Sequence, residues 1–176
     1  MIYNPFFNII VAVDENAGFG KDGKIPWHYK KDLKHFKEIT EGHICVMGRR
    51  TYEDILNNYK NKNTKIVPEN FTLLPKRETY VLSRSYGYDV IGATKKMYQR
   101  EITDDLGADE KREIFILGGE KLFIEAFPQT KVVYMTIVPG CYQCDKKFPI
   151  NYLMANFQIA EGKKVDELMF MKYVRK

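Results

Sequence analysis

The stretch IFILGGEKLFIEAF, residues 114–127, places a strand, a turn and a helix in direct succession. The four apolar residues from 114 to 117 predict a buried strand. A glycine pair then ends the strand, since glycine tolerates backbone angles that other residues resist. From Glu120 onward, apolar side chains stand at 122, 123, 126 and 127, which is the spacing of one helix face. A strand that leads directly into a helix is typical of a parallel sheet covered by helices.

The rest of the chain repeats this alternation of strands and helices. We predict strands at 6–13, 43–47, 79–83 and 132–138, and helices at 29–40, 49–56 and 94–106. Residues 57–73 are polar and rich in turn residues, which predicts a surface excursion. The tail, 157–174, reads as two strands around a turn at 162–164. We therefore expect one α/β domain over residues 1–176. Its sheet is mostly parallel and twisted, with helices on both faces and an antiparallel C-terminal edge hairpin.

The composition excludes several classes of protein. A chain of 176 residues with 44% hydrophobic residues is long and apolar enough for one folded domain. No apolar run approaches the roughly 20 residues of a membrane span. The first residues lack the pattern of a secretory signal, so we expect a cytoplasmic protein. Cys141 and Cys144 form a CxxC without a second ligand pair, which favours reduced thiols over a zinc site. The net charge of +5 by itself fits nucleic acid, an anionic small molecule or neither.

An acidic residue interrupts the apolar face of the helix predicted at 29–40. On a helical wheel of about 100° per residue, Asp32 falls between Phe36, Leu33 and Ile39, which normally face the core. Two readings of this position remain open. Asp32 is a pocket carboxylate that binds a cationic or amidine-like group or handles a proton. Alternatively, the helix begins later and Asp32 caps its N-terminus.

Three strand-to-helix turns favour an anionic ligand. They are Gly48-Arg49-Arg50-Thr51, Ser83-Arg84 and Gly118-Gly119. Exposed backbone N–H groups and the helix dipole attract anions at such turns, and arginine is suited to phosphate. The carboxyl ends of parallel strands meet at one edge of the sheet, so the three turns predict one ligand with several phosphates, such as a dinucleotide. The usual dinucleotide and P-loop glycine motifs are absent.

Taken together, these motifs resemble the dihydrofolate reductase family from Phe7 to the C-terminus. The matching motifs, in order, are Ile10-Val11-Ala12, Gly20, Ile25-Pro26-Trp27, Asp32-Leu33-x-x-Phe36, Met47-Gly48-Arg49-Arg50-Thr51, Leu74-Pro75-x-Arg77, Leu82-Ser83-Arg84, Leu117-Gly118-Gly119, Thr136, and Asp145 before Phe148-Pro149. Their order and spacing are those of the family.

The resemblance implies reduction of 7,8-dihydrofolate to tetrahydrofolate with NADPH as the cofactor. A hydride passes to C6 of the pterin and a proton to N5. The implied catalytic residues are Asp32, Trp27 and Thr136. Asp32 would bind the 2-amino and N3 side of the pterin, Trp27 would hold an ordered water near it, and Thr136 would share a hydrogen bond with the carboxylate. A diaminopyrimidine antifolate would pair its protonated ring with Asp32.

The resemblance also implies two sets of binding residues. Substrate binding falls to Ile10, Val11, Asp32, Leu33, Phe36, Lys37, Ile55, Leu74, Arg77, Leu117 and Thr136. Among them Arg77 would bind the glutamate carboxylate, and Lys37, on the outer face of its helix, would assist. Cofactor binding falls to Ala12, Phe19, Gly20, Ile25, Gly48, Arg49, Arg50, Thr51, Leu82, Ser83, Arg84, Leu117, Gly118, Gly119, Glu120, Lys121, Leu122 and Phe123.

Three further expectations follow from the resemblance to the family. Arg49 and Arg84 would lie near the 2′-phosphate and favour NADPH over NADH. The Gly118–Gly119 peptide would be cis. The loop 18–25 would be a mobile lid over the nicotinamide, and the short turn at 162–164 predicts that this lid closes without a lock on the tail hairpin.

Two other functions are alternatives to dihydrofolate reduction. A pyrimidine reductase of riboflavin synthesis shares the fold, but Trp27, Asp32 and Phe36 fit a pterin. A basic phosphate- or nucleic-acid-binding module would spread basic residues over a face with exposed aromatics, whereas these arginines stand at strand-to-helix turns. We therefore expect a monomer that acts on a small-molecule substrate, dihydrofolate, with no nucleic-acid or membrane partner.

Overall fold

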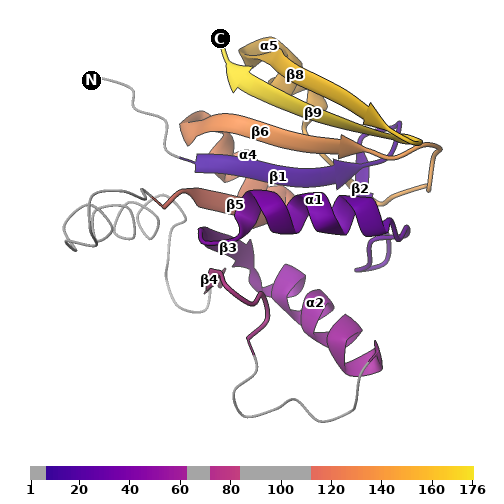
Figure 1. Ribbon diagram of the computed structural model, residues 1–176, viewed down its shortest axis with the longest axis vertical. Coiled ribbons are helices and arrows are strands. Elements are labelled where there is room, and N and C mark those ends of the chain that lie inside the picture. The colour runs from indigo at the N-terminus through magenta and orange to yellow at the C-terminus, as the bar shows by residue number, and fades with distance from the viewer. Residues whose placement is uncertain (1–6, 63–71, 84–111) are drawn as a thin grey trace.

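The computed structural model describes residues 7–62, 72–83 and 112–176. In these ranges a seven-stranded sheet forms the centre of the molecule, in the order β4-β3-β5-β1-β6-β9-β8 (Figure 1). Its strands are β1 (Phe7–Val13), β3 (Ile44–Gly48), β4 (Glu78–Leu82), β5 (Ile114–Gly118), β6 (Thr130–Ile137), β8 (Phe157–Val165) and β9 (Leu168–Arg175).

The sheet is parallel except at its C-terminal edge. Strand β1 pairs in parallel with β5 and β6, and β3 pairs in parallel with β4 and β5. Strand β9 runs antiparallel to both β6 and β8. Figure 1 shows α1 in front of the sheet and α4 behind it. The predicted fold class, a mostly parallel sheet with an antiparallel C-terminal hairpin, is confirmed.

Four α-helices and one short 3-10 helix accompany the sheet in the described ranges. They are α1 (Lys30–Thr40), α2 (Arg49–Lys62), α4 (Glu120–Ala126), η2 (Phe127–Gln129) and α5 (Ile150–Asn156). None of these helices is long and apolar enough to cross a bilayer.

The central strands are buried on both faces, as parallel strands covered by helices are. Phe7, Ile9 and Val46 on β1 and β3 are fully buried in the main core. Cys45 is also fully buried, and burial raises the pKa of its thiol to about 12. This strand cysteine therefore behaves as a small apolar core residue.

The predicted turn at 162–164 is wrong. Gly162, Lys163 and Lys164 lie inside β8, and the chain turns instead at 166–167. Gly162 stands opposite Met171 and a methyl group added there would lie 3.1 Å from its sulfur, so glycine serves close packing here. Asp166 takes the positive φ of 54° that the real turn requires, and aspartate tolerates this angle. The hairpin turn is nevertheless short, so closure of the lid without a lock on the tail hairpin stays a prediction.

Two other predictions need correction. Residues 57–62, predicted as surface excursion, continue α2, because half-buried Leu56 and Tyr59 extend its inner face at helical spacing. Helix α5 was not predicted, since Leu153 is its one fully buried residue and gives no periodic signal. The predicted helix at 94–106 and residues 63–71 of the excursion lie outside the described ranges.

The segment 14–25, which includes the expected lid at 18–25, contains a short strand. In it β2 (Gly18–Gly20) pairs with β7 (Lys146–Lys147) as a two-stranded sheet. Buried Asp14 holds this pair in place: its carboxylate accepts the backbone N–H of Gly18 at 2.7 Å and of Tyr142 at 3.0 Å. Burial acts to raise the pKa of Asp14, but these backbone donors outweigh it and hold the pKa below its ordinary value.

Gly18 is expected to be intolerant of any side chain. A methyl group added there would lie 2.5 Å from Cβ of Cys144 and 2.8 Å from its sulfur. We expect Gly18→Ala to lower the free energy of unfolding by about 1–3 kcal/mol, the usual cost of overpacking. Gly20→Ala is the matched control, because its methyl group would lie 3.5 Å from Lys146, an ordinary contact. Equal unfolding free energies for the two variants in denaturant titrations would contradict this packing.

Candidate active site

Asp32 lies in the first turn of α1 and its side chain turns toward the sheet. The helix begins at Lys30 with Tyr29 as its N-cap, and no side chain caps it. The interpretation of Asp32 as an N-cap is therefore wrong. The Asp32 carboxylate instead accepts a hydrogen bond from the hydroxyl of Thr136, which is 3% exposed on β6. The structure thus brings together two of the three predicted catalytic residues.

The surroundings of Asp32 make its charged form costly. Burial raises the pKa of Asp32, and the Thr136 hydrogen bond and the nearby His35 only partly oppose this. A carboxylate in such a place is stabilised by a ligand that donates N–H groups to it. A titratable side chain with this kind of shift is also a common mark of a functional site.

Trp27, the third predicted catalytic residue, is buried at the end of the loop before α1. Its ring packs against Tyr142 with the centroids 5.1 Å apart, and it shares an apolar cluster with Ala12 and Val138. Its Nε1–H is buried and has no acceptor among the described residues. A buried donor of this kind calls for a water or ligand acceptor.

Several predicted substrate residues form one apolar cluster between the sheet and α1. Ile10 lies at its buried centre, and Phe36, Leu74 and Leu117 pack against it. Side chains alternate along a strand, so Val11 lies on the other face of β1, in the main core. Any contact of this residue with a ligand on the Ile10 side is therefore through its backbone.

Arg77 lies at one border of this cluster and is held by the protein itself. Its Nε donates to the Pro75 carbonyl at 3.1 Å and its Nη1 to the Thr40 hydroxyl at 3.2 Å. The guanidinium also lies 5.7 Å from the ring centre of Phe36, a cation–π distance. These contacts hold the guanidinium in place for an anionic group.

The remaining predicted substrate residues frame the same space. Leu33 is 51% exposed and Lys37 is exposed on α1, as expected for its outer face, while Ile55 is half-buried on α2. The loop 18–25 reaches α2, since a methyl group on Gly23 would lie 3.5 Å from the carboxylate of Asp54 on that helix.

A glycine-lined corner forms where β3, β4 and β5 end. In the sheet Gly48 pairs with Leu82, and Met47, next to Gly48, pairs with Gly118. A methyl group on Gly48 would lie 3.7 Å from the Gly118 carbonyl, and one on Gly119 would lie 3.8 Å from the Thr51 hydroxyl. The Gly118–Gly119 peptide is cis, as the resemblance implies. Side chains at these positions would fill the corner, so it fits close approach by the phosphates of a dinucleotide.

Other predicted cofactor residues border this corner. Arg49 and Arg50 are exposed at the start of α2, where Arg49 lies 3.6 Å from Glu53. Phe19 of β2 contacts Phe123 of α4 edge to face, at 5.4 Å between centroids. The other predicted cofactor residues in the described ranges differ in their exposure to solvent. Ser83 and Glu120 are half-buried, Lys121 and Ile25 are exposed, and Leu122 and Gly20 are buried. Arg84 lies outside the described residues.

Sequence reasoning missed two residues that organise this site. Asp14 ties the loop 14–20 to residues 142–144 through partners far away in the sequence, and no local pattern announces such contacts. The helical wheel for 29–40 puts His35 with the lysines on the solvent side of α1. It is half-buried, with its ring 4.2 Å from that of Phe170 on β9.

The fold and the site together indicate a class of protein. A carboxylate beside an apolar cluster, next to a glycine-lined corner at the carboxyl ends of parallel strands, defines an α/β enzyme that uses a nucleotide cofactor. The dihydrofolate reductase family model matches residues 6–175. The chain belongs to the dihydrofolate reductase family, the NADPH-dependent oxidoreductases that reduce dihydrofolate.

Individual relatives agree with this assignment. A dihydrofolate reductase of Bacillus subtilis is 32% identical over 142 residues, which cover 81% of this chain and 74% of the relative. One of Staphylococcus aureus is 30% identical over 91% of this chain and 89% of its own. The solved structure of the Enterococcus faecalis dihydrofolate reductase, complexed with NADP(H) and RAB-propyl, matches with a TM-score of 0.71. It is 28% identical and the match covers 97% of this chain and 96% of that one. These findings do not favour the pyrimidine reductase or the nucleic-acid-binding module.

Proposed function

We propose that this chain reduces 7,8-dihydrofolate to 5,6,7,8-tetrahydrofolate with Asp32 as the carboxylate that binds the pterin. The nicotinamide of bound NADPH supplies a hydride to C6. The observation that carries the proposal is the position of half-buried Asp32 on α1, one turn before Phe36 of the apolar cluster, with Thr136 as its hydrogen-bond donor. Hydride transfer in an Asp32→Asn variant is the experiment that tests it.

Asp32 binds and orients the pterin in this proposal. Its carboxylate accepts N–H bonds from the 2-amino group and the N3 side, and Thr136 fixes the carboxylate while it does so. The negative charge next to the ring raises the proton affinity of the substrate, which favours protonation at N5. The proton itself arrives through water, for which the buried Nε1–H of Trp27 is the available donor.

The apolar cluster and Arg77 hold the rest of the substrate. Ile10, Phe36, Leu74 and Leu117 exclude water from the pterin and benzoyl rings. Arg77, held by Pro75 and Thr40, binds the glutamate carboxylate with the two parallel N–H donors that arginine offers. Leu33, Ile55 and Lys37 line or border the same space, with a backbone contact from Val11.

The glycine-lined corner holds the cofactor. Gly48, Gly118 and Gly119 admit the pyrophosphate, and Thr51 with the start of α2 supplies donors to it. Arg49 and Arg84 favour the 2′-phosphate of NADPH, and Arg50 adds positive charge. The nicotinamide side is lined by Ala12, Phe19, Gly20, Ile25, Leu117, Leu122 and Phe123, while Leu82, Ser83, Glu120 and Lys121 border the adenosine and phosphate side.

Removing the indole N–H should slow hydride transfer without loss of fold. Trp27→Phe keeps an aromatic ring against Tyr142 but removes the Nε1 donor. Loss of one hydrogen-bond donor predicts a decrease of about 2- to 10-fold in single-turnover hydride transfer. The decrease should grow as the pH rises, because water delivers the proton less readily there. A rate unchanged at every pH would contradict a role for this donor.

Arg49 should distinguish the two nicotinamide cofactors. Arg49→Gln is expected to lower kcat/KM for NADPH about 5- to 10-fold, the effect of losing a charge-assisted contact at an exposed site. NADH lacks the 2′-phosphate, so its kcat/KM should stay the same. Steady-state assays with both cofactors measure this difference, and an equal decrease for both would show that Arg49 does not read the 2′-phosphate.

Two further properties belong to the proposal. We expect the chain to act as a monomer in the cytoplasm with dihydrofolate as its small-molecule partner. Size-exclusion chromatography with light scattering measures the first directly, since a monomer has a mass of 20.7 kDa.

A further inference from the structure

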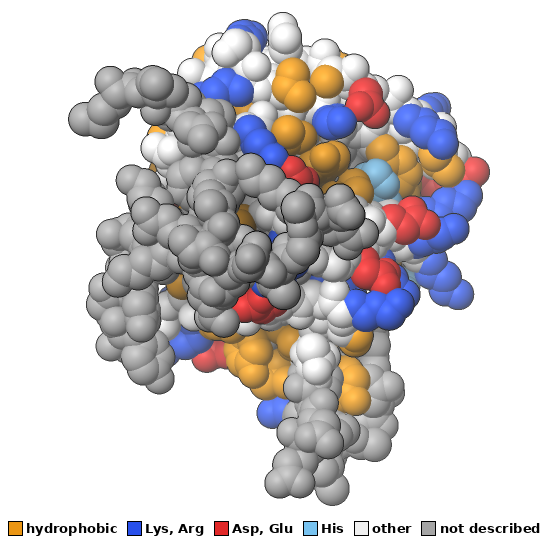
Figure 2. Space-filling model, turned by 60° about the vertical axis from the view of Figure 1, so that its left-hand side comes forward, with side chains coloured by type: hydrophobic (Ala, Val, Ile, Leu, Met, Phe, Trp, Pro, Cys, Tyr) orange, Lys and Arg blue, Asp and Glu red, His pale blue; other side chains and the backbone are white. Residues whose placement is uncertain are grey.

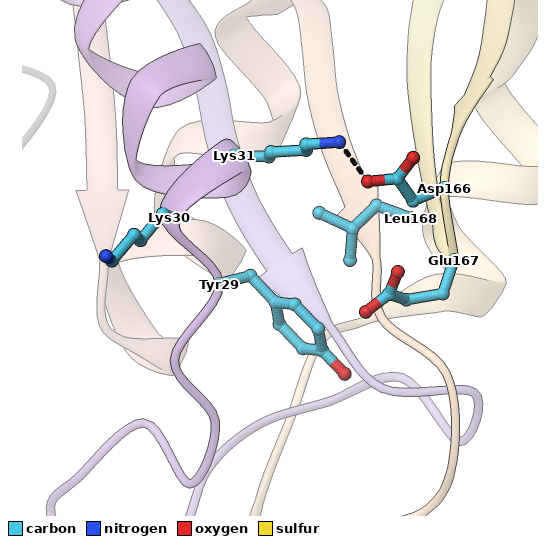
Figure 3. A pocket seen from close by; sticks show the side chains of 6 residues that line it. All are labelled: Tyr29, Lys30, Lys31, Asp166, Glu167 and Leu168. Atoms are coloured by element: carbon cyan, nitrogen blue, oxygen red, sulfur yellow. Dashed lines mark hydrogen bonds and ion pairs between the residues drawn. The ribbon is translucent and has the colours of Figure 1, made fainter.

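A second hollow of the molecule lies along α1, on the side of this helix away from α2. It is a groove of about 970 Å³ between α1 and the strands β6, β8 and β9. Figure 1 shows β9 and β8 on one side of α1 and α2 on the other. At one end of the groove, Lys31 forms an ion pair with Asp166 and so ties the start of α1 to the β8–β9 turn (Figure 3). The volume is in the range of small-molecule sites.

The floor of the groove is aromatic and apolar. The ring of Phe170 lies 4.2 Å from that of His35, tilted by 49°, and Tyr134 continues the surface on β6. Burial lowers the pKa of His35, so the imidazole is neutral at physiological pH and adds to the aromatic surface. Figure 2 shows a histidine among hydrophobic side chains, with basic and acidic side chains around them.

The rim of the groove carries an excess of positive charge. Four lysines and two glutamates line it, and Asp166 pairs with Lys31 at its end, which leaves one formal positive charge. Lys34 lies 3.7 Å from Glu38, and Lys172 lies 2.9 Å from Glu161. Lys163 forms no ion pair with any described residue and stands exposed above the floor. An aromatic floor below an uncompensated lysine selects a flat ring system that carries an anionic group.

We propose that the groove between α1, β6, β8 and β9 is a second binding site, for a planar aromatic anion. The ring system lies on Phe170, His35 and Tyr134. Its carboxylate, sulfonate or phosphate group lies at Lys163 and Lys34. Ile39 and Tyr134 border both this groove and the apolar cluster, whereas the residues named for the substrate, Ile10, Leu74 and Arg77, do not line the groove.

The direct test uses a matched pair of fluorescent probes. 1-Anilinonaphthalene-8-sulfonate carries the anionic group, and N-phenyl-1-naphthylamine has the same rings without it. Both are titrated into the protein with and without saturating NADPH and folate, so that binding in the proposed active site is recognised by its loss. We expect the sulfonate to bind at least fivefold more tightly than the neutral probe and to keep binding when both ligands are present. Equal affinities, or complete displacement by the two ligands, would overturn the proposal.

Neighbouring lysines on β8 supply the matched variants. Lys163 lines the groove, whereas Lys164 does not, although both are exposed on the same strand. Lys163→Gln should weaken sulfonate binding about 2- to 5-fold, and the double variant with Lys34→Gln more than that. Lys164→Gln should leave it unchanged. Equal weakening by the two single variants would show a general charge effect and no site.

Tyrosine ring resonances locate the probe independently of affinity. In protein labelled with [ring-¹³C]tyrosine, Tyr134 lines the groove, while Tyr152 is 36% exposed on α5 and does not line it. Addition of the sulfonate probe should shift the Tyr134 signal, assigned with Tyr134→Phe, and leave the Tyr152 signal in place. A stationary Tyr134 signal during saturating binding would place the probe elsewhere and contradict the proposal.

Discussion

Asp32→Asn is expected to lower the rate of hydride transfer at least 100-fold and, at neutral pH, to raise the unfolding temperature. The amide keeps the shape of the side chain and still accepts the Thr136 hydroxyl. It lacks the charge that binds the pterin and favours protonation at N5, and such proton-transfer roles are worth about 10²- to 10⁴-fold. Single-turnover hydride transfer and thermal unfolding of the same preparation measure both effects.

The stability gain follows from the sign of the pKa shift. Burial raises the pKa of Asp32 above 3.8, so the charged form is disfavoured in the folded state. The contribution of Asp32 to stability is therefore complete below its unfolded pKa and is lost as the pH rises through the folded pKa. The advantage of Asp32→Asn should be largest at neutral pH and disappear near pH 3.8 or below.

A control separates this effect from the general loss of a negative charge. Glu125→Gln, at an exposed position on α4, should leave both the rate and the unfolding temperature unchanged. An Asp32→Asn variant that keeps its activity, or that unfolds at a lower temperature than the wild type at neutral pH, would contradict the role given to this carboxylate. Enzymes often retain such costly groups because function requires them.

Arg77→Leu is expected to raise KM for dihydrofolate about 10- to 100-fold while kcat changes little. The guanidinium contacts the glutamate carboxylate equally in the ground state and the transition state, and loss of such uniform binding appears in KM. Arg77→Lys should recover only part of the loss, because an ammonium group cannot make the paired contacts.

Dihydropteroate supplies the control for Arg77, since it lacks the glutamate. Its kinetic constants should be the same with the wild type and with Arg77→Leu. If the variant impairs both substrates equally, Arg77 acts by holding Phe36 and Thr40 in place, and the assignment to the glutamate carboxylate is wrong.

Local sequence patterns predicted most of the sheet because its strands are short apolar runs between turns. They failed where a contact between distant segments decides the structure. Gly162 looks like a turn residue, yet β9 packs so closely against it that it belongs to a strand. Strands β2 and β7 are too short to show a period, and their pairing depends on Asp14, whose partner Tyr142 is 128 residues away.

The candidate site was predictable to a similar degree. The wheel position of Asp32 indicated an unusual carboxylate, but only the structure chose between a pocket residue and an N-cap, by placing Thr136 beside it. The same wheel placed His35 on the solvent face, because it carries no information on how closely β9 approaches α1. The roles of the individual residues rested on the resemblance to the family and remain predictions.

The most direct test is an assay of NADPH oxidation by the purified wild-type chain. Dihydrofolate is compared with the pyrimidine substrate of the riboflavin-pathway reductases, and NADPH with NADH. The account predicts rapid loss of NADPH absorbance with dihydrofolate, much slower turnover with NADH, and none with the pyrimidine. A folded protein that oxidises NADPH only with the pyrimidine, or with neither substrate, would contradict it.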